Sequence, residues 1–173
     1  MMQAYRTSFL LGIVSGLFGL LWMILSALYA AEGSPIQLMA GPISLLVLGV
    51  CIVVEMFLLR KRHAGEKLSF GTAMRSGLLI ALFTSILLTI GSYIYCTQIE
   101  PDFAELMISR SEAYFAKEGK SAEDIAKNSE MLREAFTLKA ELNKTFVGTM
   151  LMGFLFSLIF SLVFSNRKFG TVE

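Results

Sequence analysis

The sequence predicts an all-α integral membrane protein with four transmembrane helices and a helical extracytoplasmic loop between the third and fourth. Of its 173 residues, 55% are hydrophobic and only 17% are charged, and the mean hydropathy is +0.65. The apolar residues fall in four blocks, each long enough to cross a bilayer core of about 30 Å. Because four spans use most of the chain, we expect a single domain over residues 1–173.

The first two spans are expected at about residues 7–30 and 37–59. A short turn with Gly and Pro, residues 32–35, joins them and makes them antiparallel. A signal peptide is the alternative interpretation of the first block. Its apolar region is too long for that, which favours an uncleaved anchor.

Glu55 is the one ionisable residue within the second span, on a helical stripe with Cys51. An intramembrane carboxylate is by default a functional candidate. The alternative is a structural role near the interface, paired with Arg60, Arg62 or Arg75. Both interpretations stay open, and Glu55, Cys51 and Arg75 form the candidate intramembrane polar site.

The segment between the second and third spans, residues 60–75, is the most basic in the chain. Short loops rich in Lys and Arg stay in the cytoplasm. Arg6 and Arg167 lie on the same side in a four-span topology, so both termini are expected to be cytoplasmic. Nucleic-acid binding is the other interpretation of a basic run. Proximity to the membrane favours contact with anionic lipid heads instead, and the candidate residues are Arg60, Lys61, Arg62 and Lys67.

Small residues recur at helical spacing in the first span and in the third and fourth, which are expected at about residues 76–96 and 145–165. Such residues let helix backbones approach closely in lipid. The candidate helix-packing stripe comprises Gly12, Gly16, Gly77, Ala81, Ser85, Gly153, Ser157 and Ser161. Packing within the chain is favoured over packing on a second copy, on a partner subunit or around a pore.

The polar loop, residues 97–144, carries ten acids and seven bases. It should form two helices, the first with Pro101 at its first position and Gly119 at its end. Ser121 to Asp124 resembles a capping box that opens the second helix. No proline or glycine interrupts residues 122–146, so the second helix is expected to run unbroken into the last span.

The chemistry-bearing residues are sparse. Cys51 and Cys96 should lie at depths that differ by roughly 20 Å, too far apart for a disulfide, so two free thiols are expected. His63 is the only histidine, and no metal-ligand spacing surrounds the cysteines. Glu123 and Asp124 are explained by their place in a first helical turn. We therefore predict no cofactor, no metal and no catalytic residue.

Three short segments carry a family resemblance: Leu68-Ser-Phe-Gly-Thr-Ala-Met-Arg-Ser-Gly77, Tyr93-Ile-Tyr95 and Ile99-Glu-Pro-Asp-Phe103. In these segments the chain resembles the bacterial membrane proteins catalogued as domain of unknown function four-one-nine-nine, found mainly in the Bacteroidota. The likeness covers nearly the whole chain. It implies four spans with a long loop between the third and fourth, and it brings no assigned activity, cofactor or catalytic residue.

The expected function is that of a non-enzymatic subunit of the bacterial inner membrane, structural or accessory, which binds lipids, itself or other membrane proteins, and no nucleic acid. The alternative is a small oligomeric transporter or channel, with Glu55 as its coupling residue. A membrane enzyme is the weakest of the three, because histidine-rich and paired-acid motifs are absent from the sequence.

Overall fold

The computed structural model describes residues 5–29, 39–62 and 68–166, and the regular elements of these segments are all helices. Four are long and apolar enough to cross a membrane, with mean hydropathies of 2.0 to 2.5. They are α1 (Arg6–Tyr29), α3 (Ala40–Arg62), α4 (Phe70–Ile94, continued by the π-helical turn η1, Tyr95–Ile99) and α7 (Leu138–Asn166). The prediction of an all-α protein with four membrane-spanning helices is therefore confirmed.

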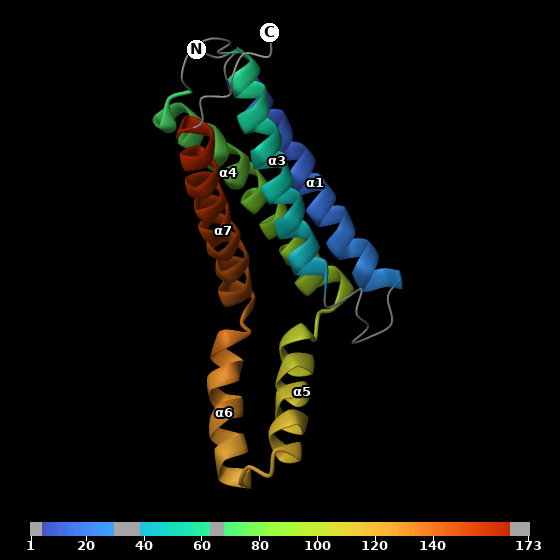
Figure 1. Ribbon diagram of the computed structural model, residues 1–173. Helices are drawn as coiled ribbons and strands as arrows, with labels where there is room; N and C mark the ends of the chain where they lie inside the picture. Colours follow the sequence, from blue (N-terminus) through green and yellow to red (C-terminus); the bar gives the residue numbers. More distant parts are fainter. Residues whose placement is uncertain (1–4, 30–38, 63–67, 167–173) are drawn as a thin grey trace.

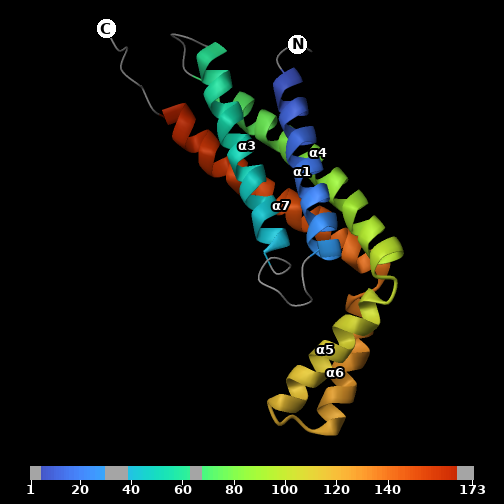
Figure 2. The same ribbon diagram turned by 90° about the vertical axis from the view of Figure 1, so that its right-hand side faces the viewer.

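Helix α4 is the central helix of the bundle. It packs along α1 on one side and along α7 on the other, while α3 bridges α1 and α7 (Figures 1 and 2). Gly12 lies against Ile80, and Gly16 lies against Leu87. Positions thus increase together along α1 and α4, so these two helices run parallel.

The bundle buries many small polar residues and exposes many large apolar residues. Ser8, Ser15 and Thr84 are fully buried, whereas Leu46 and Val147 are 64% and 60% exposed. An apolar surface of this extent would promote aggregation in water, but it suits contact with lipid chains. The distribution of side chains therefore agrees with four helices in a membrane.

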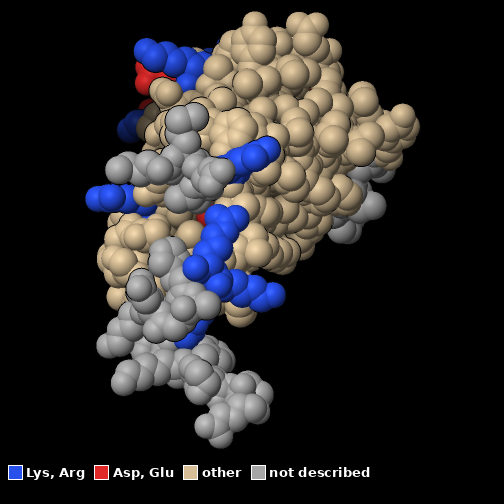
Figure 3. Space-filling view, turned by 90° about the horizontal axis from the view of Figure 1, so that it is seen from above, with Lys and Arg blue, Asp and Glu red and all other residues tan. Residues whose placement is uncertain are grey.

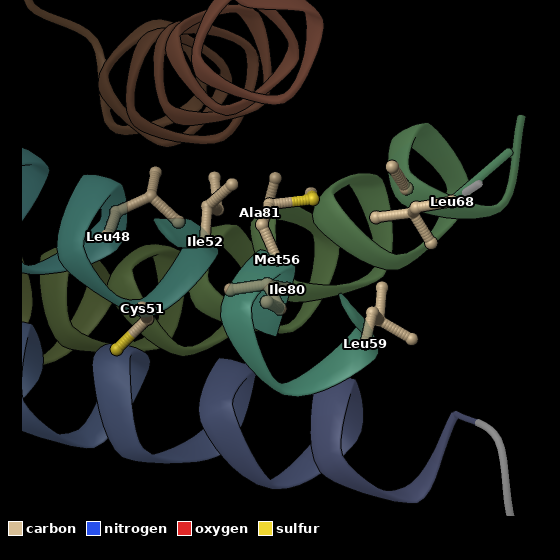
Figure 4. Packing of buried hydrophobic residues seen from close by; sticks show 9 residues of the cluster. Leu48, Cys51, Ile52, Met56, Leu59, Leu68, Ile80 and Ala81 are labelled. Carbon is tan, nitrogen blue, oxygen red and sulfur yellow. The ribbon is translucent and has the colours of Figure 1, made fainter. Parts of the chain in front are cut away.

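The apolar core lies where α3 meets α4 and α7. Leu48, Ile52 and Met56 of α3 are fully buried and pack with Ile80 and Ala81 of α4 (Figure 4). Apolar residues at every third or fourth position of α3 point to this seam, because one turn of helix takes about 3.6 residues. The core holds α3 in place over the groove between its two neighbours.

The helices that contain the last two spans extend beyond the predicted apolar blocks. Helix α4 starts at Phe70, ahead of the span expected from about residue 76, and α7 starts at Leu138, ahead of the span expected from about residue 145. Ser69 occupies the position before α4 with an extended backbone, but its side chain makes no capping hydrogen bond. Both helices extend past the apolar block because polar residues can continue a helix beyond the hydrocarbon.

The helix that precedes the last span does not run unbroken into it, so this prediction is wrong. Helix α6 ends at Ala135, and α7 begins at Leu138. The Thr137 hydroxyl accepts a hydrogen bond from the Ala140 amide at 3.3 Å and donates one to the Glu134 carbonyl at 3.2 Å. Thr137 therefore caps α7 at its N-terminus and ends α6 without any proline or glycine.

Helices α5 (Phe103–Lys117) and α6 (Ala122–Ala135) form an antiparallel hairpin that extends beyond the ends of the four spans (Figures 1 and 2). Gly119 ends α5 with a φ of +74°, and the Lys120 amide donates to the Phe115 carbonyl, as in a Schellman motif. The Ser121 hydroxyl caps α6 by accepting from the Asp124 amide at 3.2 Å. The predicted end of α5 and start of α6 are thus confirmed.

The start of α5 differs slightly from prediction. Pro101 lies in a turn before the helix, and Asp102 occupies the capping position ahead of Phe103. The Phe103 amide donates to the Glu100 carbonyl at 3.1 Å and closes this turn. Proline still serves to redirect the chain here, because it fixes its own φ and lacks an amide donor.

Aromatic side chains connect the hairpin to the bundle. The Phe103 ring packs edge-on against Tyr95 at 5.6 Å and against Phe136 at 6.1 Å between centroids. The Lys144 ammonium lies 5.5 Å from the Phe136 ring centroid. This cluster joins η1, α5, the α6–α7 junction and α7, so it fixes the base of the hairpin.

Candidate functional site

The site with most functional character surrounds Glu55, which is fully buried near the end of α3. Its Oε1 atom accepts a hydrogen bond from the Ser8 hydroxyl at 2.6 Å and a longer one from Thr7 at 3.3 Å. Ser8 is fully buried as well. We call Thr7, Ser8 and Glu55 the Glu55 site.

Arg62 connects the Glu55 site to the surface of the bundle. Its Nη1 atom donates to the Thr7 hydroxyl at 3.0 Å, and Thr7 in turn donates to Glu55. The guanidinium itself is exposed. Arg62 is therefore linked to the Glu55 carboxyl group through the Thr7 hydroxyl.

Antiparallel packing of α1 and α3 produces this site. Gly19 lies against Ser44, and at the opposite end of the pair Ser8 bonds to Glu55. The start of α1 must therefore lie beside the last turns of α3. The sequence contained a signal for this, since two adjacent hydroxyls open the first apolar block at the level where Glu55 closes the second.

The other two members of the predicted polar site are placed differently. Cys51 is buried one turn from Glu55, and its thiol points to α1 near Ser15 (Figure 4). Arg75 is exposed at the start of α4. Both described cysteines are free thiols, as predicted. The structure thus brings Thr7 and Ser8 to Glu55, and sequence reasoning had named neither.

Basic side chains gather at the end of the bundle near Glu55, which we call the basic end (Figure 3). Lys61 and Arg62 are exposed at the end of α3, and Arg60 is half-buried. The fourth predicted lipid contact, Lys67, lies outside the described residues. His63, the only histidine of the sequence, lies outside them as well. Lys and Arg near a membrane surface gain about 1 kcal/mol each from anionic lipid heads.

The predicted packing stripe lies at contacts within the chain. A Cβ atom at Gly12 would come 2.9 Å from the Phe83 Cβ of α4. A Cβ atom at Gly16 would meet Leu87, also of α4. Gly77 lies against Ser157, and Gly153 against Ala81, where any added Cβ would overlap its neighbour. Ser85 and Ser161 are fully buried. Close approach of α1 and α7 to the two faces of α4 therefore accounts for the glycines of the predicted stripe.

Within residues 5–29, 39–62 and 68–166, no three His, Cys, Asp or Glu side chains lie close enough together to hold a metal ion. Outside the bundle, a partly buried hydrogen bond joins the two helices of the hairpin. There the Ser129 hydroxyl donates to Glu112 at 2.6 Å and so links α6 to α5. This contact has the geometry of a structural hydrogen bond between two helices.

Residues 10–166 match the family described as Protein of unknown function (DUF4199). The chain belongs to this family. No curated protein and no solved structure matches the sequence. The family match covers all four spans and the hairpin, so it confirms the resemblance seen in the sequence and leaves function to be inferred from the site and the fold.

Proposed function

We propose that this member of the DUF4199 family is a non-enzymatic accessory subunit of the bacterial inner membrane, whose outer hairpin binds another membrane protein. The observation that carries this proposal is the hairpin itself. It extends beyond the spans, and among the described residues it contacts the bundle at its base (Figure 2). Two of its large side chains, Tyr114 and Met131, are 58% and 57% exposed.

Exposed aromatic and methionine side chains are enriched in protein interfaces. The hairpin also has less packing of its own than the bundle, with Ile108 and Ser129 as its buried residues. A partner that covered Tyr114 and Met131 would stabilise both helices. The small-residue stripes, in contrast, are used for contacts within the chain, so a partner would bind at the hairpin more readily than at the spans.

The basic end supports a topology for this subunit. Arg6, Lys61, Arg62 and Arg75 are exposed there, at the opposite end of the bundle from the hairpin. Because Lys and Arg remain on the cytoplasmic side, this end would face the cytoplasm and contact anionic lipids. The hairpin would then stand on the outer face of the inner membrane.

Photo-crosslinking in native membranes tests this role. A benzoylphenylalanine at Tyr114 or Met131 should give an adduct with one membrane protein, which should also co-purify stoichiometrically in mild detergent. A probe at Val147, which is 60% exposed in α7, serves as the matched control and should label lipid. A Tyr114→Lys variant should lose the co-purifying protein, and a hairpin probe that labels no protein would exclude the accessory role.

A buried carboxyl group favours a second candidate, a small oligomeric transporter or channel. Ionisable residues inside a membrane frequently mark ion pathways, and Glu55 is fully buried. Reconstituted vesicles with the wild-type protein and the Glu55→Gln variant provide the test. Equal fluxes of protons and alkali cations in the two preparations would rule out Glu55 as a coupling residue.

A further inference from the structure

Three buried oxygen atoms near the basic end have no hydrogen-bond partner among the described residues. They are Oε2 of Glu55 and the hydroxyls of Ser76 and Ser161, and all three residues are fully buried. Glu55 and Ser76 belong to α3 and α4, whereas Ser161 belongs to α7. A buried polar atom without a partner costs about 1–3 kcal/mol, and more when it is charged. Such atoms in a folded protein call for a ligand, a water molecule or an ion.

Helix register places Oε2 of Glu55 and the Ser76 hydroxyl at the same level of the bundle. Gly12 of α1 lies against Ile80 of α4, and these helices run parallel. Ser8 and Ser76 each lie four residues before that contact, so both are one turn closer to the basic end. Because Ser8 bonds to Glu55, Ser76 and the carboxyl group occupy one level on facing helices.

Hydrogen bonding at the carboxyl group is asymmetric. Oε1 accepts from Ser8 and Thr7, whereas Oε2 has no donor. In a neutral acid, the carbonyl oxygen accepts hydrogen bonds and the other oxygen carries the proton. A bare carboxylate at this depth would leave half of its charge without a donor, and burial makes that costly.

We propose that Glu55 binds one small monovalent cation at Oε2, with the Ser76 hydroxyl as the second oxygen of the site. A proton would be carried on Oε2, the carboxyl oxygen that accepts no hydrogen bond. A sodium ion would bind between Oε2 and the Ser76 hydroxyl and use both oxygens as ligands. Either cation would neutralise the carboxyl group, and a sodium ion would also satisfy the Ser76 hydroxyl.

Arginine residues lie at the basic end, on each of the three helices that form the site. Arg6 of α1 and Arg75 of α4 are exposed, Arg60 of α3 is half-buried, and Arg62 reaches Thr7. The charged residues in the described part of α7 lie at its opposite end, within residues 138–144. Positive charge at this end would repel a bound cation, so we expect the cation to exchange.

Cation binding at Glu55 involves neither Tyr114 nor any partner protein, so it is tested independently of the accessory role. Labelling with dicyclohexylcarbodiimide tests it in native membranes. This apolar reagent attacks protonated carboxyl groups. The acid proton moves to a carbodiimide nitrogen, the carboxyl oxygen adds to the central carbon, and acyl transfer to nitrogen leaves a stable N-acylurea.

In sodium-free buffer, peptide mass spectrometry should locate the adduct on Glu55. The labelling rate should fall as the pH rises, because the reagent attacks only the protonated carboxyl group. A rate unaffected by sodium would establish the proton as the ligand, whereas suppression by sodium would establish sodium binding at the same oxygens. Absence of label on Glu55 at every pH without sodium would overturn the proposal.

Two variants refine this test. Ser76→Ala removes the second oxygen and should shift the pH midpoint of labelling or abolish protection by sodium. Ser85→Ala is the matched control, since Ser85 is equally buried but donates to the Leu82 carbonyl of its own helix at 2.9 Å. Identical labelling of wild type and Ser76→Ala would exclude Ser76 as a ligand. The wild-type series remains decisive if either variant fails to fold.

Discussion

The four-helix bundle and the hairpin of α5 and α6 are both helical, but different contacts hold them together. In the bundle, glycines and serines bring backbones close, as where Gly153 meets Ala81 and Gly77 meets Ser157. In the hairpin, the buried set is small, and Ser129 bonds across to Glu112. The hairpin instead has well-capped helices at its turn, where Gly119 ends α5 and Ser121 caps the start of α6.

This difference follows from the two surroundings that the regions are built for. Lipid offers no hydrophobic drive between helices, so close packing and hydrogen bonds must hold the spans together. In water, two short helices bury too little apolar surface to be stable alone, and capping contributes a larger share. The bundle should therefore be sensitive to added volume, and the hairpin to changes in backbone conformation.

Adding one methyl group at the α4–α7 contact should have the largest effect. In Gly153→Ala, the new Cβ would overlap the Ala81 Cβ and lie 3.3 Å from the Ala81 Cα, so the helices must separate. We expect a loss of about 1–3 kcal/mol in stability, as for other overpacked contacts. Thermal unfolding in a mild detergent, followed by circular dichroism, measures it.

Gly148→Ala on the same helix is the control, because no atom lies within 4 Å of a Cβ at that position. Its stability should stay within about 0.5 kcal/mol of wild type. If both variants unfolded at the same temperature, α4 and α7 would not approach as closely as the contact requires, and the contrast with the hairpin would fail.

Removal of the Ser8 hydroxyl should have the next largest effect. Ser8→Ala deletes the 2.6 Å hydrogen bond to Glu55. Hydrogen bonds between helices in membranes contribute about 0.6–1.7 kcal/mol, and we expect a loss in this range. Denaturation in SDS against a mild detergent gives the free energy of unfolding.

Ser26→Ala provides the comparison, since Ser26 donates to the Met23 carbonyl of its own helix at 2.9 Å. Its loss should be smaller, because no second helix is involved. A Ser8→Ala variant no less stable than Ser26→Ala would mean that the Glu55 site does not help to hold α1 against α3.

Within the hairpin, Gly119→Ala should cost about 1 kcal/mol, because an L side chain is strained at a positive φ. Nothing lies within 4 Å of a Cβ here, so the cost is conformational and not steric. Hydrogen exchange should become faster in α5 and α6, with little change in the spans. Faster exchange throughout the bundle would show that the hairpin and the spans unfold as one unit.

The sequence was sufficient for features that are local along the chain. Long apolar blocks identified the four spans, and Gly119 and Ser121 marked the ends of α5 and α6, because helix signals act within a few residues. Thr137 was missed, although threonine is a good cap, because no glycine or proline drew attention to the break between α6 and α7.

Features that depend on two distant segments were predicted less well. Apolar periodicity indicates which face of a helix is buried, but not which neighbour covers it. Glu55 was therefore identified as a candidate, while its donors Thr7 and Ser8 were not. The partners considered for Glu55 were Arg60, Arg62 and Arg75. Identifying Thr7 and Ser8 required the register of α1 against α3, which the folded bundle supplies.

The smallest predicted effect is a pH dependence in the hairpin. The Tyr114 hydroxyl donates to Glu118 at 2.5 Å, and this hydrogen bond, with the negative charge of Glu118, raises the pKa of Tyr114 above its ordinary 10.0. The fold thus favours the neutral tyrosine. Its contribution to stability is complete below pH 10 and is lost as the pH rises through the folded-state pKa.

Ultraviolet titration should show a late-ionising tyrosine that is absent from Tyr114→Phe. Glu118→Gln removes the negative charge and should lower the pKa of Tyr114 toward its ordinary value. Tyr29→Phe removes a tyrosine from α1 and should leave the late group unchanged. If the late group persisted in Tyr114→Phe, the hydrogen bond between Tyr114 and Glu118 would not be formed. The tip of the hairpin would then be stabilised by its capping motifs without this side-chain contact.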